Sequence, residues 1–297
     1  FREQEEQVRL SYRLATIKTD VELEQSLEEL LLKPVDKESL LAVYREYELR
    51  NLIKELESGG EERAGQEGAA DDAAAPAAAI ETDYSCILEE AEFDDWLAQL
   101  QAAPLFAFDT ETTSLDYMEA RVVGVSFAIE PGKAAYVPFG HDYLGAPTQL
   151  TEQQVLGKLK PLLEDPARLK VGQNLKYDMH VLENHGIGLR GVVFDTMLAS
   201  YVLDATATRH NLGDLAKYYL DRDSISFESI AGKGVKQLTF NQVGIDQAAP
   251  YAGEDADLTL RLTDLFSREL RVVPALDSLL RELELPVQRV LQKMERH

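Results

Sequence analysis

Cysteine is almost absent from the sequence, which has Cys86 alone among its 297 residues. One thiol excludes a framework of internal disulfide bonds and is typical of a reducing cytosol. Long apolar runs are missing too, since no stretch approaches the roughly 18 residues that a membrane-spanning helix needs. The first residues lack the pattern of a secretory signal peptide. They begin at Phe1 rather than at a methionine, so we expect a fragment or a processed product.

Basic residues are few relative to acidic ones, with 30 Lys and Arg against 53 Asp and Glu and a formal net charge of −23. Proteins that coat nucleic acid use Lys and Arg to neutralise phosphates, so this composition argues against a broad surface of that kind. Much of the acidity lies in the first ninety residues. The charge does not exclude an enzyme that binds only a strand end and holds its phosphate through metal ions.

The N-terminal third differs in composition from the rest of the chain. Residues 1 to about 56 have helical spacing of apolar side chains, in Leu27, Leu30 and Leu31 and again in Leu40, Leu41, Tyr44 and Tyr47. From about Ser58 to Thr82 the composition shifts to Gly, Ala, Glu and Asp. We expect a flexible linker over residues 57–83, with a short Ala-rich helix as the alternative.

From Tyr84 onward, strand patterns alternate with helix patterns. The patterns predict strands at 106–110, 122–129, 134–138, 169–171 and 192–194. They predict helices at 91–101, 151–163, 177–184 and 196–203, and mainly helix after residue 211. A Pro131-Gly132 turn makes the early strands antiparallel. We therefore expect an α/β fold in which helices flank a mixed sheet.

Two carboxylates stand at the end of the first of these strands. Asp109 and Glu111 follow the apolar run 105–108. Residues two apart on a strand project from the same face of the sheet, so these acids should lie side by side. Unpaired buried charge is costly, and a divalent metal ion is the usual compensation.

Three more residues complete a constellation of four acids and a phenol. Asp178 follows a polar run where a strand gives way to a helix, a common position for functional groups. Tyr251 and Asp255 are spaced to share one face of a helix. Singly, each is more typical of a turn, a helix cap or a solvated face. Together they indicate a site for phosphodiester cleavage, since close like charges need cations and oxygen ligands favour Mg²⁺ or Mn²⁺ over zinc.

Three segments resemble the motifs of the DEDDy proofreading exonucleases, namely Phe106–Thr112, Val171–Asp178 and Tyr251–Asp257. A Tyr at position 251, where a sister subclass has His, places the resemblance in the tyrosine subclass. The similarity is to the exonuclease domain of bacterial DNA polymerase I (family A) and runs from about Tyr84 to His297. Residues 1–56 look like the C-terminal end of the 5′ nuclease domain of that family.

The resemblance implies a ribonuclease H-like fold and roles for the five residues above. Asp109, Glu111 and Asp255 would hold the tighter of two divalent metal ions. Asp109 would bridge to the second ion, and Asp178 would contact that ion through water. Tyr251 and Glu111 would orient the attacking water.

The resemblance also implies contacts to the substrate, a single-stranded or frayed DNA 3′ end. Leu115 and Phe227 would wedge against or stack on the terminal bases. Gln173, Asn174 and Arg209 would contact the sugar–phosphate strand. The product would be a deoxynucleoside 5′-monophosphate, released by a monomer in the bacterial cytoplasm, where the parent protein would be associated with the nucleoid.

This resemblance divides the chain into four parts: a 5′ nuclease remnant (1–56), a linker (57–83), the exonuclease domain (84–270) and a helical connection (271–297) toward a polymerase domain. Only the proofreading activity would be complete, in a parent protein that polymerises DNA for replication and repair. Two alternatives stay open, a ribonuclease D-like RNA 3′ exonuclease and a non-catalytic nucleic-acid-binding module. The full set of four acids and Tyr251 argues against the second.

Overall fold

The computed structural model describes residues 5–17, 36–47, 49, 52–53, 56 and 82–296. The chain divides into two units, residues 1–75 and 76–297. In the first unit the described helices are α1 (Glu5–Ala15) and α2 (Lys37–Glu46). Helix α2 contains Leu40, Leu41 and Tyr44, as their spacing predicts. The predicted helical residues 27–31 and positions 57–81 of the expected linker lie outside the described residues.

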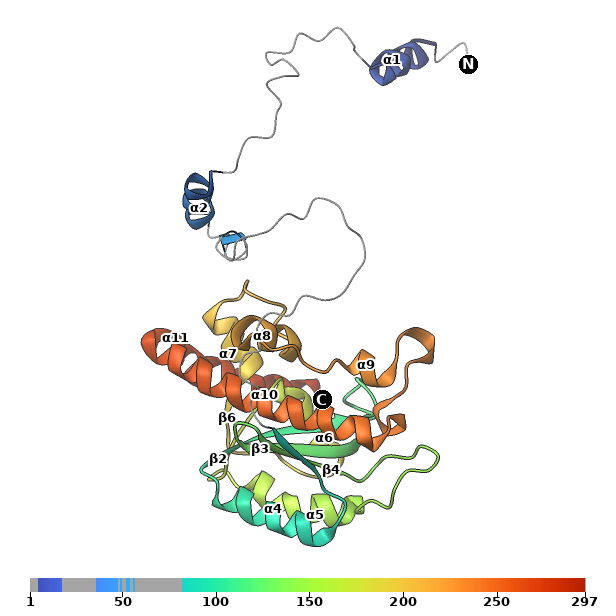
Figure 1. Ribbon diagram of the computed structural model, residues 1–297, viewed down its shortest axis with the longest axis vertical. Coiled ribbons are helices and arrows are strands. Elements are labelled where there is room, and N and C mark those ends of the chain that lie inside the picture. The colour runs from blue at the N-terminus through green and yellow to red at the C-terminus, as the bar shows by residue number, and fades with distance from the viewer. Residues whose placement is uncertain are drawn as a thin grey trace. The chain divides into compact units, whose positions relative to one another are not determined.

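The second unit is built on a six-stranded sheet with strand order β1-β4-β3-β2-β5-β6 (Figure 1). The strands are β1 (Asp83–Cys86), β2 (Leu105–Thr112), β3 (Val122–Glu130), β4 (Lys133–Pro138), β5 (Leu169–Gly172) and β6 (Val192–Asp195). Strands β2, β3 and β4 pair antiparallel, whereas β1 pairs with β4, and β5 with β2 and β6, in parallel. The predicted mixed sheet of an α/β fold is thus confirmed.

Strand β1 is an element that the sequence patterns did not predict. It is four residues long and only partly buried, and it pairs with the neighbouring strand β4 from Asp83 to Cys86. So short a run carries too few alternations to stand out from a loop. It also starts at Asp83, inside the range expected for the linker.

Helices cover both faces of the sheet (Figure 1). Helices α4 (Glu90–Ala102) and α5 (Glu152–Glu164) lie on one face, and the long α10 (Ile245–Val272) crosses the other. Strand β3 is buried over seven successive residues, as a strand covered on both faces must be. Thr151 begins α5 with a capping box to Gln154, which confirms the predicted helix start.

The remaining elements pack against this framework, several of them on α10. In chain order they are α6 (Leu175–Asn184), α7 (Thr196–Leu203), α8 (Leu212–Leu220), α9 (Phe227–Ala231), η3 (Gly234–Lys236), η4 (Phe240–Gln242), α11 (Pro274–Ser278), η5 (Leu279–Glu284) and α12 (Leu285–Glu295). No helix in the described part of the chain is long and apolar enough to cross a membrane.

The expected domain boundary at residue 270 falls inside α10. The segment beyond this boundary belongs to the same second unit. Leu280 and Leu285 belong to the main apolar core. Gln288 and Arg296 on or beside α12 donate hydrogen bonds to Asp195 and to the His180 carbonyl. Residues 271–296 therefore pack within this unit, and their expected role as a connection toward a polymerase domain stays a prediction.

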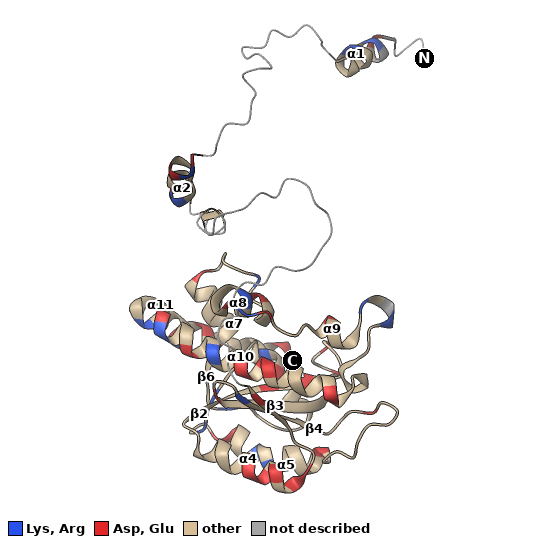
Figure 2. Cartoon of the chain, in the orientation of Figure 1, with Lys and Arg blue, Asp and Glu red and all other residues tan. Residues whose placement is uncertain are grey.

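Charge is unevenly distributed over the second unit (Figure 2). Acidic residues lie along α4, acidic and basic residues are mixed on α5 and α10, and basic residues lie on the loop after α9. This loop carries Lys233 and Lys236, both exposed. The Lys233 ammonium pairs with Glu228 at 2.5 Å, so part of this positive charge is already matched within the chain.

Candidate active site

Strand β2 places two carboxylates at its C-terminal end. Asp109 and Glu111 lie two residues apart, and Asp109 stands opposite Ser126 of β3. The β2–β3 register shifts between Glu111 and Thr112. Such an irregularity interrupts regular pairing and bends the strand, so the regular β2–β3 ladder is broken directly after the second acid.

Helix α10 brings the third carboxylate to this point. It packs across β2, β3 and β4, and Tyr251 and Asp255 lie one turn apart on it. One carboxylate oxygen from each of Asp109, Glu111 and Asp255 lies within 4.8 Å of the others. The three acids converge although almost 150 residues of sequence separate the strand from the helix.

Asp178, in the first turn of α6, is joined to β2 by hydrogen bonds. Its Oδ1 accepts from the Thr110 N–H at 3.1 Å and from the Thr110 hydroxyl at 2.6 Å. The Thr110 N–H is free for this contact because β5 pairs with β2 only as far as Ala107. Asp178 is 2% exposed and lies behind Thr110, outside the three-carboxylate cluster.

Burial raises the pKa of every acid in the constellation, and the charges of neighbouring acids add to it at Glu111, Asp178 and Asp255. Burial raises the pKa of Asp109 to about 7. Burial, followed by the charges of Asp109, Asp255 and Asp178, raises the pKa of Glu111 well above its ordinary value. The pKa values of Asp178 and Asp255 are raised by burial and then by Asp109. Four carboxylates this close repel one another when they are ionised, unless a positive charge compensates them.

The donor set fits a divalent cation. Glu111 Oε1 is buried and has no hydrogen-bond partner among the residues that the structure describes. The clustered ligand atoms are all carboxylate oxygens, which suit hard ions such as Mg²⁺ or Mn²⁺. The orphaned oxygen and the three-acid cluster together show that Asp109, Glu111 and Asp255 could hold a metal ion.

Tyr251 contributes a phenol that keeps its proton. Burial, and then the negative charges of Asp255, Glu111 and Asp109, raise the pKa of Tyr251 far above its ordinary value. A phenol in this state donates a hydrogen bond and does not act as a base at neutral pH. Its ring lies 6.3 Å from that of Phe227 and 5.9 Å from that of Phe240, measured between centroids.

A pocket of about 830 Å³ opens over the acids. Nine of the ten site residues singled out in the sequence line it: Asp109, Glu111, Leu115, Gln173, Asn174, Arg209, Phe227, Tyr251 and Asp255. The tenth, Asp178, does not line the pocket but accepts hydrogen bonds from Thr110, which does. Leu115 is 92% exposed at the rim, an unusual environment for a leucine.

One rim of the pocket consists of two loops with left-handed backbone. Asn174 precedes α6 at φ 57°, and His210, next to Arg209, has φ 59°. Gln173 connects the loops, because its Nε2 donates to the His210 carbonyl at 2.9 Å. Non-glycine residues hold this conformation only where their surroundings enforce it. The side chains of Gln173, Asn174 and Arg209 therefore extend from backbone whose conformation is fixed by its surroundings.

Sequence reasoning missed several residues of this pocket. Thr110 holds Asp178, Tyr177 contacts the loop that carries Leu115, and Phe240 stacks on Phe227 with ring centroids 6.2 Å apart. Strand alternation predicts that the Thr110 side chain projects from the opposite face of the sheet to Asp109 and Glu111, and this signal could have identified it. No local pattern distinguishes Tyr177 or Phe240 from ordinary half-buried aromatics.

Comparisons with known proteins agree with this geometry. A family model described as 3′-5′ exonuclease matches residues 84–271. DNA polymerase I of Pseudomonas aeruginosa is 52% identical over 99% of this chain and 32% of its own length. DNA polymerase I of Chloroflexus aurantiacus is 38% identical over 99% of this chain and 33% of its own length. The chain thus spans about a third of the length of these relatives.

Solved structures with the same fold include polymerase and ribonuclease chains. The POL domain of Pol1 from M. smegmatis, in complex with DNA primer-template and dNTP, is 26% identical with a TM-score of 0.56, over 71% of this chain and 32% of its own. Escherichia coli RNase D is 17% identical with a TM-score of 0.51, over 71% of this chain and 51% of its own, and shows the fold alone. Because the family model covers more than half of the residues, including all four acids and Tyr251, the chain belongs to the 3′-5′ exonuclease family of DNA polymerase A.

Proposed function

We propose that this chain removes nucleotides from unpaired DNA 3′ ends by metal-dependent hydrolysis. The observation that carries the proposal is the convergence of Asp109, Glu111 and Asp255 with the protonated Tyr251 at the floor of one open pocket. The pocket rim is lined by apolar and hydrogen-bonding residues rather than by a basic patch. It therefore suits a strand end more than a long duplex.

We assign two divalent ions, Mg²⁺ or Mn²⁺, to the four acids. Asp109, Glu111 and Asp255 would hold the first ion. Asp109 would share the second, and Asp178 would face it through water. When bound, such ions supply an activated water and stabilise the charge on the leaving oxygen. The raised pKa values of the acids support this assignment, because a bound cation would stabilise the ionised forms that burial disfavours.

The protein side chains position the reactants. Tyr251 would donate its phenolic proton in a hydrogen bond to the attacking water, and Glu111 would accept one from it. Leu115 and Phe227 would contact the terminal bases, and base stacking on an aromatic ring tolerates any sequence. Gln173, Asn174 and Arg209 would hold the sugar–phosphate strand, which sets the register of the scissile bond.

We further propose that the parent protein is a bacterial DNA polymerase I in which this unit proofreads. The supporting observation is the similarity of the whole chain to polymerases about three times its length. Residues 1–56 would belong to the 5′ nuclease part. A DNA substrate would place the protein with the nucleoid, in the cytoplasm, where the exonuclease unit would act as a monomer.

The test is a nuclease assay on three 5′-labelled substrates: a single strand, a duplex with a mismatched 3′ end and a fully matched duplex. With Mg²⁺ we expect the single strand to be degraded much faster than the matched duplex, with the mismatched duplex between them. Melting several terminal base pairs requires a few kcal/mol, since stacking averages roughly 1.4 kcal/mol per step. A chelator should abolish all three reactions, and mononucleotides with a 5′ phosphate should be the product.

Two results would contradict the proposal. Equal rates on matched duplex and single strand would show that the pocket does not require unpaired ends. Faster degradation of a single-stranded RNA of the same sequence would favour the ribonuclease D-like alternative, in which contacts to the 2′-hydroxyl select the substrate. Retention of full activity in the chelator would refute the role of the acids.

A further inference from the structure

The loop between β2 and β3, residues 113–121, carries Leu115 at the pocket rim. It begins directly after Thr112, the last residue of β2 and the neighbour of Glu111, so its path determines where Leu115 stands relative to the acids. The loop has few buried apolar side chains: Leu115 is 92% exposed and Met118 49% exposed, whereas Ala120 is buried and Tyr117 packs, partly buried, against the main core. Apolar packing therefore supports only part of the loop, and polar contacts hold the rest.

Helix α6 supplies these contacts from one face. Tyr177, His180 and Asn184 are spaced at i, i+3 and i+7, which places them in line on the helix. The Tyr177 hydroxyl contacts the Ser114 carbonyl and the Thr112 hydroxyl. The His180 ring stacks on Tyr117 with centroids 4.0 Å apart. The loop thus lies along the helix whose first turn carries Asp178.

Asn184 holds the second half of the loop through two backbone carbonyls. Its Nδ2 donates to the Tyr117 carbonyl at 2.8 Å and to the Ala120 carbonyl at 3.0 Å. Its Oδ1 accepts from Arg296 Nη2 at 2.9 Å. Two acceptors on one side and a guanidinium on the other leave a single orientation for the amide.

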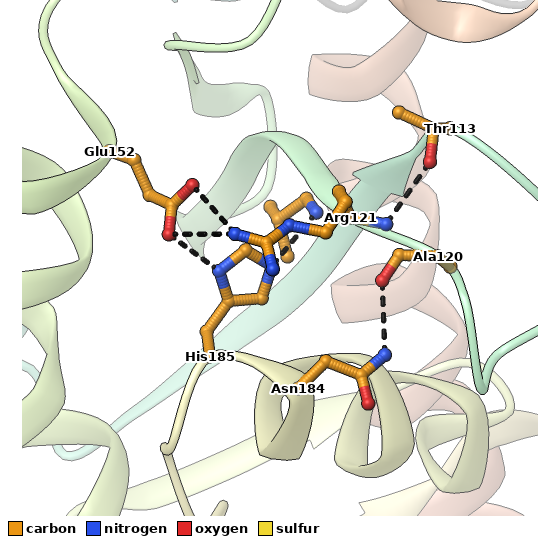
Figure 3. A network of polar contacts seen from close by, with 7 residues as sticks. Thr113, Ala120, Arg121, Glu152, Asn184 and His185 are labelled. Carbon is orange, nitrogen blue, oxygen red and sulfur yellow. Dashed lines mark hydrogen bonds and ion pairs between the residues drawn. The ribbon is translucent and has the colours of Figure 1, made fainter.

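His185, the next residue, fastens the base of the loop (Figure 3). Its Nε2 accepts from the Val122 N–H at 3.1 Å, so its Nδ1 donates to Glu152 Oε1 at 2.8 Å. Glu152 also pairs with Arg121 at 3.4 Å. The Arg121 and Thr113 backbones close the loop, because Thr113 N–H donates to the Arg121 carbonyl at 3.0 Å.

We propose that Asn184 and His185 are positioning residues that fix Leu115 against the 3′-terminal bases and so set the affinity for unpaired ends. The inference rests on the proposed exonuclease function. Neither residue lines the pocket, and each acts through the loop. Because α6 also carries Asp178, one rigid helix sets the distance between the acids and the apolar contact at the rim.

Asn184→Ala is the direct test, measured as KM and kcat on a single strand with saturating Mg²⁺. We expect KM to rise about 3–10-fold, as expected for a partial loss of one leucine contact, with kcat within twofold. A merely structural defect would lower kcat by reducing the active fraction and leave KM unchanged. Hydrogen exchange should accelerate in residues 113–121 and not in β3.

A double-mutant cycle with Leu115→Ala makes the test specific. If Asn184 acts through Leu115, then Asn184→Ala should change KM less than twofold in the Leu115→Ala background. Arg296→Ala is the matched control. It removes the contacts to Asn184 Oδ1, to the His180 carbonyl and to Glu183 but leaves both contacts of Asn184 to the loop carbonyls, so KM should stay unchanged. Additive effects of Asn184→Ala and Leu115→Ala would overturn the proposal.

Glu152 allows the role of His185 to be tested without a substitution in α6, because its side chain is 46% exposed and lies at the start of α5. Glu152→Ala removes the acceptor for His185 and should raise KM about 2–5-fold. Glu152→Gln keeps an acceptor oxygen and should restore KM, and the exposed neighbour Gln153→Ala should change nothing. Unchanged KM in Glu152→Ala would overturn the role of His185. Complete inactivity of the unmodified chain on single strands would instead refute the proposed function.

Discussion

Asp109 and Tyr251 share the pocket floor but offer different chemistry, a ligand oxygen and a hydrogen-bond donor. Asp109→Ala removes an oxygen that we assign to both metal ions. Tyr251→Phe removes one hydrogen bond to the water and keeps the ring. We expect Tyr251→Phe to lower kcat by about 10–10²-fold and Asp109→Ala to lower it further, in single-turnover assays at saturating Mg²⁺.

Asp264→Ala is a suitable control for this comparison, because Asp264 lies on the same helix and is exposed. Its kcat should match that of the unmodified chain. Equal losses in Asp109→Ala and Tyr251→Phe would refute the distinct roles that we assign to the two side chains.

The raised pKa of Asp109 predicts a pH dependence for the metal-free protein. Burial raises this pKa to about 7, against about 3.9 in an unfolded chain. Between these values the folded state holds a proton that the unfolded chain releases, so the free energy of unfolding falls as pH rises. In a chelator we expect Tm to be about 5–10 °C lower at pH 8 than at pH 5.

Removing the carboxylate should reduce this effect, so Asp109→Asn should show a smaller decrease in Tm over the same range. Added Mg²⁺ should raise Tm more at pH 8 than at pH 5, because only ionised acids bind it well. A metal-free Tm that does not fall between pH 5 and 8 would contradict the predicted protonation of the cluster.

At the scale of elements, Asp195 at the end of β6 organises two helix starts and binds a side chain of a third helix. Its buried carboxylate accepts from the backbone N–H groups of Asn174, Leu175, Met197 and Leu198 and from the Gln288 amide. The first two donors begin α6, the next two begin α7, and the last belongs to α12. A single acid thereby satisfies helix N-termini that would otherwise stay unpaired in the interior.

We expect Asp195→Ala to lower the free energy of unfolding by about 3 kcal/mol or more, since several buried donors lose a charged partner. For a unit of this size Tm should fall by roughly 6–12 °C. Asn211→Ala, which removes the exposed N-cap of α8, should lower the free energy of unfolding by only about 1 kcal/mol. Similar losses in the two variants, measured by urea unfolding, would show that Asp195 has no organising role beyond one cap.

The elements differ in how well local sequence predicts them. Helix α5 is predicted almost to the residue because Thr151 and Gln154 form a capping box. The spacing predicts a start of α6 at Tyr177, but the helix begins at Leu175, after a left-handed Asn174 and where the Asn174 and Leu175 N–H groups bind the distant Asp195. Strand β1 exists because β4 offers a free edge, which no pattern within residues 83–86 reveals.

At the scale of the whole molecule, all lining residues of the pocket and the apolar core lie between residues 84 and 285. We therefore propose that the second unit folds and acts alone. A chain that starts at Thr82 should degrade single-stranded DNA with a kcat/KM within about threefold of the full chain and unfold with the same Tm. Loss of activity in the shortened chain would show that the N-terminal residues belong to the catalytic fold.

The sequence by itself determined which side chains share a face. Asp109 and Glu111 follow the two-residue period of a strand, and Tyr251 and Asp255 follow the four-residue step of a helix. These periods are properties of local backbone geometry, so they hold wherever the segments lie. The resemblance to a known family then assigned these faces to one site, and the family model that matches residues 84–271 agrees with it.

Only the tertiary structure decided how those faces meet. It brings Asp255 within 4.8 Å of the β2 acids, places Asp178 behind Thr110, and sets Asn184 against the loop of Leu115. These contacts join residues that are 67 to about 150 positions apart, and each depends on where a strand stops pairing or a helix crosses the sheet. Packing of the whole unit determines such distances. The periodicity of a short segment cannot predict them, because it reports only which side chains share a face of one strand or helix.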